Sequence, residues 1–249
     1  MILAISTSSF QFSIALLEAD GSLRAEYVMA NGAGRFAGMF PAFEELVSAA
    51  GASPRDVSAL AVGIGPGSFT GLRVGLAAAK GFAHSLGVPL VGVSSLQSLA
   101  CQLTGHNDGS DTIAPLLDAR RAEVFTAPFA HGSFFPEKSA EEVCVPFNDL
   151  PAVYGGRAVF VGNDFSRQAP ILKKVFGESV LLAPPHLWHL RASAVGALGL
   201  QRLDREDYDD RNTLAPVYLR APDISPNPYA DLFKDARPDS IASGAEGES

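Results

Sequence analysis

The chain has few of the residues that most often build metal or redox sites. Its 249 residues include only two cysteines, Cys101 and Cys144, and five histidines. The cysteines lie far apart in sequence and form no Cys-x-x-Cys pair, so neither a zinc ribbon nor a thioredoxin-type motif is supported. We therefore expect two free thiols in a reducing compartment and no metal site.

Positive charge and long apolar runs are also lacking. The net charge is -8 and the isoelectric point about 5.1, which argues against a standalone nucleic-acid binder, because neutralising phosphates takes basic patches. The apolar stretches are interrupted well before the roughly 18 residues of a membrane span. No basic segment of a signal peptide follows Met1. The sequence predicts a cytoplasmic protein with no membrane partner, in which a partner subunit would hold any RNA.

What the chain does contain is an alternation of apolar runs of strand length with segments of helical spacing, which predicts an α/β protein. We expect strands at residues 1–5, 10–17, 23–29, 59–64, 90–93, 113–117, 123–129 and 158–162, and helices at residues 35–50, 70–86, 95–103, 165–176 and 192–203.

A polar, turn-rich stretch at residues 104–111 is the candidate domain boundary. We expect a first domain over residues 1–105 and a second α/β domain over 106–220, whose last segment could return to the first. Residues 221–249 are rich in Pro, Gly and Ser and are expected to form a disordered tail.

The most unusual stretch runs from Gly63 to Gly81. An apolar strand leads into Gly65-Pro66-Gly67-Ser68, and Thr70 stands where the N-cap of the following helix is expected. Glycines before a helix start are typical of a phosphate cradle. However, Leu72 replaces the Lys of a Walker A loop, and the third glycine of a dinucleotide fingerprint is missing. A phosphate site and a tight turn without a ligand both remain open.

A second turn, Ser6-Thr7-Ser8-Ser9, is rich in hydroxyl groups and follows the first expected strand. Together with the glycine loop it could form a nucleotide cleft. An actin-like or kinase-like ATPase needs an acid at the end of this strand, because Mg²⁺ prefers carboxylate oxygens. Position 6 is Ser, which weakens the case for phosphoryl transfer by this chain alone. The candidate nucleotide-binding residues are Ser6, Thr7, Ser8, Gly65, Gly67, Ser68 and Thr70.

The helix expected at residues 70–86 carries a row of small residues, among them Gly71 and Gly75. Each glycine inside a helix costs about 0.5 to 1 kcal/mol relative to alanine, so the row needs a reason. Close approach of another helix or strand would supply one. Spacing alone leaves open whether that neighbour belongs to this chain or to another.

Three further groups of residues are candidates for binding or catalysis. The stretch from Asp118 to Glu123 holds two acids and two arginines after a strand, which suits either a phosphate or carboxylate site or a salt-bridged hairpin. His186 and His189 could share a helix face and bind a metal, but a surface loop explains them as well. Ser68 does not stand in a Gly-x-Ser-x-Gly nucleophile elbow. The sequence therefore offers no catalytic residue.

Four stretches together resemble the TsaB (YeaZ) family, the non-catalytic subunit of the bacterial machinery that makes threonylcarbamoyladenosine in tRNA. They are residues 2–8, 65–75, 118–124 and 216–220, in the family's order over about residues 1–220. The most specific is Gly-Pro-Gly-Ser-Phe-Thr-Gly-Leu-Arg. The resemblance implies an α/β fold of the two-domain actin-like kind (acetate kinase, Hsp70, actin) with a degenerate nucleotide site.

The resemblance also implies a scaffold that activates a catalytic TsaD-like paralogue, with a TsaE-like ATPase as third partner and tRNA reached through the complex. The chain would have no activity alone and no intrinsic cofactor, ATP and Mg²⁺ acting only in the assembled complex. In the family the first two helices form the pairing surface, which could also support a homodimer. The implied interface residues are Phe36, Met39, Phe40, Phe43, Gly71, Gly75, Ala78, Ala79 and Phe82.

The sequence departs from the family at two places. Ser6 stands where Asp is common, and Gly34-Arg35-Phe36-Ala37 replaces a stretch that commonly holds a His. Both departures lead away from independent ATP or metal chemistry. The alternative function is an actin-fold nucleotide-binding phosphotransferase or hydrolase that acts on its own.

Overall fold

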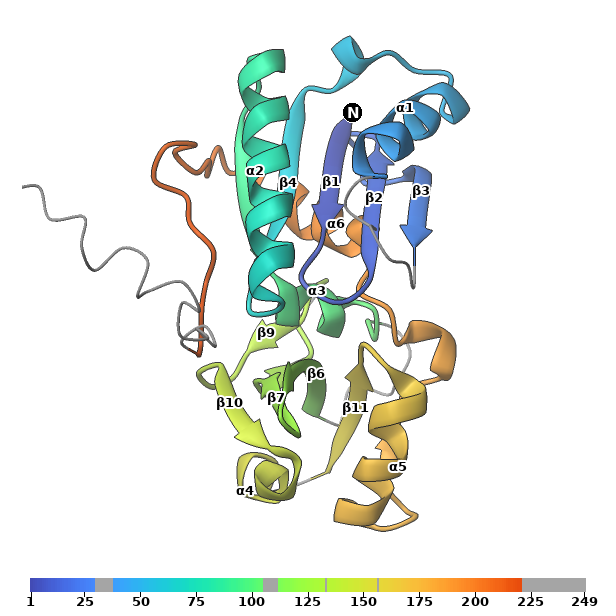
Figure 1. The fold of residues 1–249 in the computed structure, drawn as a ribbon, viewed down its shortest axis with the longest axis vertical. Helices are drawn as coiled ribbons and strands as arrows, with labels where there is room; N and C mark the ends of the chain where they lie inside the picture. Colours follow the sequence, from blue (N-terminus) through green and yellow to red (C-terminus); the bar gives the residue numbers. More distant parts are fainter. Residues whose placement is uncertain (30–37, 105–111, 133, 156, 221–249) are drawn as a thin grey trace, which may run out of the picture.

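The computed structural model describes residues 1–29, 38–104, 112–132, 134–155 and 157–220, which form two α/β units (Figure 1). The sheet of the first unit has the strand order β3-β2-β1-β4-β5. Its first three strands form an antiparallel meander, and the last two run parallel to β1. The strands are β1 (Ile2–Ser6), β2 (Phe12–Leu17), β3 (Leu23–Met29), β4 (Ala59–Gly65) and β5 (Leu90–Ser94).

The sheet of the second unit repeats this topology. Its main path is β10-β7-β6-β11-β12, again three antiparallel strands followed by two parallel ones. The described chain thus contains one strand arrangement twice. The strands of the second sheet are β6 (Thr112–Arg120), β7 (Glu123–Thr126), β8 (Phe129–Ala130), β9 (Glu137–Lys138), β10 (Val143–Pro146), β11 (Ala158–Gly162) and β12 (Leu181–Leu182).

Helices cover both faces of the first sheet. In β1, Leu3 and Ile5 pack in the cluster that holds the buried side chains of α1 (Met39–Ala49) and α2 (Phe69–Leu86). Ile2 and Ala4 pack in the opposite cluster with α6 (Ala192–Leu203), which returns to the first sheet after the second unit (Figure 1). Burial on both faces explains why β1 is a continuous apolar run rather than an alternating one.

The second core gathers the remaining helices around Trp188, which is fully buried and donates its indole N–H to the Ala183 carbonyl at 2.9 Å. Cys101 and Cys144 are free thiols, as expected, and burial raises the pKa of Cys101 to about 11. The remaining helices are α3 (Ser95–Cys101), α4 (Leu150–Val153), α5 (Phe165–Phe176) and the 3₁₀ turns Pro54–Asp56, Phe147–Asp149 and Pro185–Leu187.

The element bounds agree well with the sequence, with instructive differences. Strand β11 and helices α5 and α6 have the predicted bounds. Helix α2 begins one residue early, because the Ser68 hydroxyl rather than Thr70 caps it, accepting from the Gly71 N–H at 3.3 Å. Helix α1 begins at Met39, which places Pro41 in the first turn, where a missing N–H costs nothing. The predicted start of this helix at residue 35, the domain boundary at 105/106 and the tail at 221–249 lie outside the described residues.

The side chain of Gln11 joins the two units. It is 2% exposed, and its amide nitrogen donates to the Asn163 carbonyl at 3.1 Å and lies 2.5 Å from Nδ1 of His189. Its amide oxygen accepts from the Leu190 N–H at 3.3 Å. Because the amide nitrogen can only donate, Nδ1 of His189 must accept, which requires a neutral imidazole.

This contact predicts a pH-dependent stability. Burial lowers the pKa of His189 below its ordinary value of 6.5, and the positive charge of Arg191 lowers it further, while Asp164 opposes the shift. The unfolded chain therefore binds the proton more readily, so the stabilisation is complete above pH 6.5 and is lost as the pH falls below it. We expect urea midpoints to decline between pH about 7.5 and about 5.5 more steeply for the wild type than for His189→Gln. Equal slopes for both proteins would contradict this role.

Candidate functional site

The hydroxyl-rich turn after β1 packs directly on the glycine loop between β4 and α2. The Ser68 N–H donates to the Ser8 carbonyl at 2.6 Å, and the Thr7 hydroxyl donates to the Gly71 carbonyl at 2.8 Å. The Ser8 hydroxyl accepts from Ser95 at 2.6 Å. Residues 6–9 are all buried. The two stretches that the sequence assigned to a nucleotide cleft therefore meet in direct contact.

The glycines of this region are explained by that contact. A Cβ on Gly67 would lie under 3.0 Å from the Ser8 backbone, and a Cβ on Gly71 or Gly75 would lie equally close to Thr7. Gly65 has a φ of 122° and is faced by the Val217 carbonyl. The neighbour that the small residues require is thus within the chain.

These contacts give a reason within the chain for glycines that the sequence assigned to a partner interface or to a nucleotide. Gly71 and Gly75 are buried against the chain's own turn, so they cannot contribute to a partner interface in this structure. A Cβ at Gly65 or Gly67 would meet the backbone of Val217 or Ser8, so close packing within the chain already requires glycine at both positions. Spacing could show that something approaches these glycines, but it could not show what.

Other predicted interface residues divide by burial. Met39, Phe43 and Ala79 are buried, and Phe36 lies outside the described residues. Phe40 is 59% exposed, and its ring lies 5.5 Å from that of the partly exposed Phe82. Among the exposed and partly exposed residues of the two helices, we call one group of apolar residues the α1–α2 surface: Phe40, Val74, Ala77, Ala78, Gly81 and Phe82.

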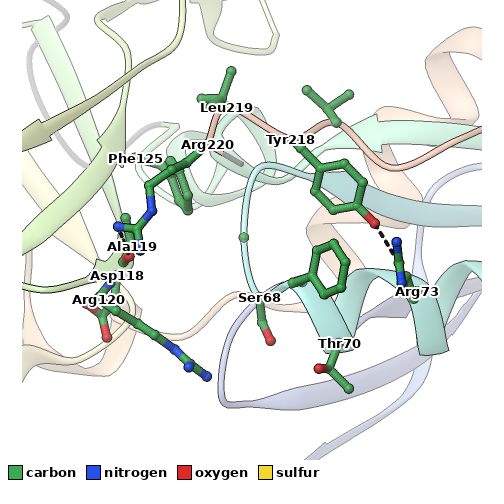
Figure 2. A pocket seen from close by; sticks show the side chains of 13 residues that line it. Ser68, Thr70, Arg73, Asp118, Ala119, Arg120, Phe125, Tyr218, Leu219 and Arg220 are labelled. Atoms are coloured by element: carbon green, nitrogen blue, oxygen red, sulfur yellow. Dashed lines mark hydrogen bonds between the residues drawn. The ribbon is translucent and has the colours of Figure 1, made fainter. Parts of the chain in front are cut away.

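A cleft of about 530 Å³ opens beside the glycine loop between β4 and α2 (Figure 2). It is lined by the start of α2, by the β6–β7 hairpin and by residues 217–220, so three of the four family-like stretches meet around it. Gly67, Ser68 and Thr70, all predicted as nucleotide-binding, line this cleft. A hollow of about 180 Å³ adjoins it, shares Ser68 and Arg120 with it and reaches Ser8.

Residues 217–220, which we call the closing segment, connect the two units across the cleft. The Val217 N–H donates to the Ile64 carbonyl at 2.8 Å, on the first unit. Arg220 donates to the Ala119 carbonyl at 3.0 Å and pairs with Glu123 at 2.6 Å, on the second unit. The sequence marked this stretch only by its family likeness.

The wall that α2 contributes was missed by the sequence reasoning. The Tyr218 ring lies 5.1 Å from that of Phe69, and the Tyr218 hydroxyl accepts from Nε of Arg73 at 3.0 Å. The Arg73 guanidinium also lies 3.8 Å from the centre of the Phe69 ring. An aromatic residue and an arginine four positions apart on a helix share one face, and that spacing was the available signal.

The stretch from Asp118 to Glu123 is a hairpin, but its ion pairs are not internal. Positive φ angles at Arg120 and the two residues after it form the turn between β6 and β7. Asp118 pairs with Arg167 of α5 at 3.0 Å, and Glu123 pairs with the closing segment. The Arg120 side chain is left to extend into the cleft toward Ser68 (Figure 2).

Comparison with known proteins gives consistent results. A family model described as TsaD, tRNA N6-adenosine threonylcarbamoyltransferase, matches residues 37–225. A Bacillus subtilis (strain 168) protein named tRNA threonylcarbamoyladenosine biosynthesis protein TsaB is 32% identical, covering 88% of this chain and 93% of the relative. An Escherichia coli (strain K12) protein of that name is 35% identical, covering 51% of this chain and 54% of the relative.

Among solved structures, YeaZ from Pseudomonas aeruginosa is similar, with a TM-score of 0.74 at 23% identity over 88% of this chain and 99% of that one. With the repeated strand topology, this likeness confirms the two-domain actin-like fold. In the described part of the chain, no three His, Cys, Asp or Glu side chains are grouped to hold a metal ion. None of the helices in the same part has the length and apolar character needed to cross a membrane.

The contact of Thr7 with α2 predicts opposite effects for two glycine substitutions in one helix. Gly75→Ala places a methyl group against Thr7 and should lower the free energy of unfolding by about 1 to 3 kcal/mol. Gly81→Ala meets nothing within 4 Å and should raise it by about 0.5 to 1 kcal/mol through helix propensity. Urea denaturation measures both.

A substitution at Thr7 tests whether this residue is the neighbour that makes Gly75→Ala destabilising. Thr7→Ala removes the hydroxyl that a Cβ on Gly75 meets, so it should reduce the penalty of Gly75→Ala, whereas Gly71→Ala meets the Thr7 backbone and should gain no relief. Equal penalties for Gly75→Ala in both backgrounds would show that the neighbour is another group.

Proposed function

The chain belongs to the TsaB family of tRNA threonylcarbamoyladenosine biosynthesis proteins, and we propose that it acts there as a non-catalytic subunit that pairs with a TsaD-like paralogue through its α1–α2 surface. The observation that carries the proposal is the character of this surface. Its members are aromatic, aliphatic or small, and Phe40 is 59% exposed. Monomeric proteins rarely leave such contiguous apolar patches open unless a partner covers them.

The packing of α2 supports a pairing role in a second way. The helix is held to its own sheet by buried residues, whereas on its outer side Ala77 and Ala78 carry only methyl groups and Gly81 has no side chain. Short side chains let a helix of another subunit approach closely. Glu44 and Glu45 of α1 are exposed, and Glu44 lies one helical turn after Phe40, so a charged side chain stands next to the aromatic one, as at the polar rim of protein interfaces.

In this role the chain performs no catalytic step itself, and the TsaD-like paralogue carries out the threonylcarbamoyl transfer. The direct contact of the hydroxyl turn with the glycine loop favours a scaffold over an independent phosphotransferase. We include a TsaE-like ATPase as third partner, ATP and Mg²⁺ as ligands of the assembled complex, and tRNA held mainly by the other subunits, since this chain has a net charge of -8. Without the paralogue, a second copy of the chain would cover the same surface.

Co-purification with a TsaD-like protein from the same source tests the pairing, and a tRNA modification assay with and without this chain tests the function. We expect a stoichiometric complex and modification that depends on the chain. Full modification without the chain would refute an activating role. Turnover of ATP by the isolated chain would favour the alternative enzyme instead.

A single exposed side chain tests the surface. Phe40→Asp should weaken pairing by about 2 kcal/mol or more, because it buries a charge where an aromatic ring was desolvated. Phe134→Asp, at a position 80% exposed on the second unit, is the matched control and should pair normally. Co-purification yield and the apparent dissociation constant measure the effect, and thermal melting confirms folding. If Phe40→Asp paired at full strength, the interface would have to lie elsewhere.

A further inference from the structure

The cleft between the two units has two unlike walls. Arg120 of the hairpin and Arg220 lie on one side, and Tyr218 faces them from the other (Figure 2). The Phe69 ring packs beside Tyr218, with 5.1 Å between the ring centroids. The hydroxyl groups of Ser68 and Thr70 lie between the two walls. A cationic wall thus faces an aromatic wall, with hydrogen-bonding groups between them.

The charges around the cleft do not balance. Asp118, the only carboxylate among the described lining residues, already pairs with Arg167, and Arg220 pairs with Glu123. Arg73 contacts Phe69 and Tyr218 but no carboxylate among the described residues.

The Arg120 guanidinium makes no hydrogen bond or ion pair with any residue in the described ranges. The positive charges of Arg73 and Arg120 therefore have no carboxylate partner among the described residues, in a chain whose net charge is -8. An exposed, unpaired arginine contributes little to stability, so folding does not account for this arrangement.

We propose that this cleft binds a nucleoside monophosphate, with the phosphate on Arg120 and the Ser68 hydroxyl and the base against the Tyr218 ring. A guanidinium presents a planar fork of donors that matches phosphate oxygens. Tyr218 is 40% exposed, which leaves ring surface for a base although Phe69 packs beside it. A volume of about 530 Å³ lies in the usual range for small-ligand pockets.

This site differs from the one that the sequence suggested. The glycine loop is filled by the turn that contains Thr7 and Ser8, so the phosphate is placed on the hairpin side of the cleft instead. The inference also goes beyond the proposed pairing function, because the residues of the α1–α2 surface do not line the cleft. Ligand binding and partner binding can therefore be measured separately on the same variants.

Isothermal titration of the full chain with AMP, adenosine and inorganic phosphate tests the proposal. AMP should bind with one site and at least tenfold more tightly than either fragment, because only AMP reaches both walls. Arg120→Gln should weaken AMP at least tenfold, the loss expected for one charge-assisted phosphate contact. Arg55→Gln, on the exposed 3₁₀ turn Pro54–Asp56 outside the cleft, is the matched control and should bind AMP like the wild type.

A second variant tests the aromatic wall. Tyr218→Leu should lower the affinity for AMP severalfold and leave the affinity for inorganic phosphate unchanged. Unfolding of the cleft would instead lower both affinities. Thermal melting of each variant confirms that the protein is folded.

Three results would overturn the proposal: no AMP binding at millimolar concentration, AMP no tighter than phosphate, or equal losses in Arg120→Gln and Arg55→Gln. A short single-stranded RNA that bound more tightly than AMP, and depended on Arg120, would assign the cleft to RNA and so reject the free nucleotide.

Discussion

The packing of Thr7 against α2 is the contact on which the rest of the first unit depends. Without side chains at Gly71 and Gly75, the helix can lie directly on the turn after β1, and the Thr7 hydroxyl then bonds to the Gly71 carbonyl. Each of these glycines carries the helix-propensity cost of about 0.5 to 1 kcal/mol. The close approach offsets that cost with buried contacts and a satisfied backbone carbonyl. It also fixes where the outer face of α2 stands.

The same contact uses backbone groups that a phosphate cradle would need. A cradle needs free N–H groups that point into open space, whereas the Ser68 N–H is already bonded to the Ser8 carbonyl and the Gly71 N–H to the Ser68 hydroxyl. Ser6, where an acid would bind a metal in a related ATPase fold, is 2% exposed. The glycines serve the packing of the turn on the helix, and the proposed anion contact is therefore placed on Arg120 at the opposite wall.

Sequence reasoning predicted the elements well because their signals are local. The Asp20-Gly21 hairpin, the apolar run of β4 and the end of α2 at Gly87, with its φ of 70°, each depend on neighbouring residues. The site could be predicted only in part, because its contacts join distant residues. Arg220 and Glu123 are 97 positions apart, and no periodicity links them. The row of small residues correctly indicated that another segment packs closely on the helix. Spacing alone could not show whether that segment belongs to this chain or to another.

Helix α2 contributes both to the cleft and to the α1–α2 surface, so one continuous helix connects the two proposed sites. Phe69 and Arg73 face the cleft from its first turns, and Ala78 and Phe82 lie on the α1–α2 surface further along. The helix is capped by Ser68 and closed by Gly87, and the Thr7 contact lies between its two ends. A ligand in the cleft can therefore shift the pairing surface only by moving α2 as one body. That movement would break the Thr7 contacts and tilt the helix against its sheet, so the packing of Thr7 on α2 opposes it.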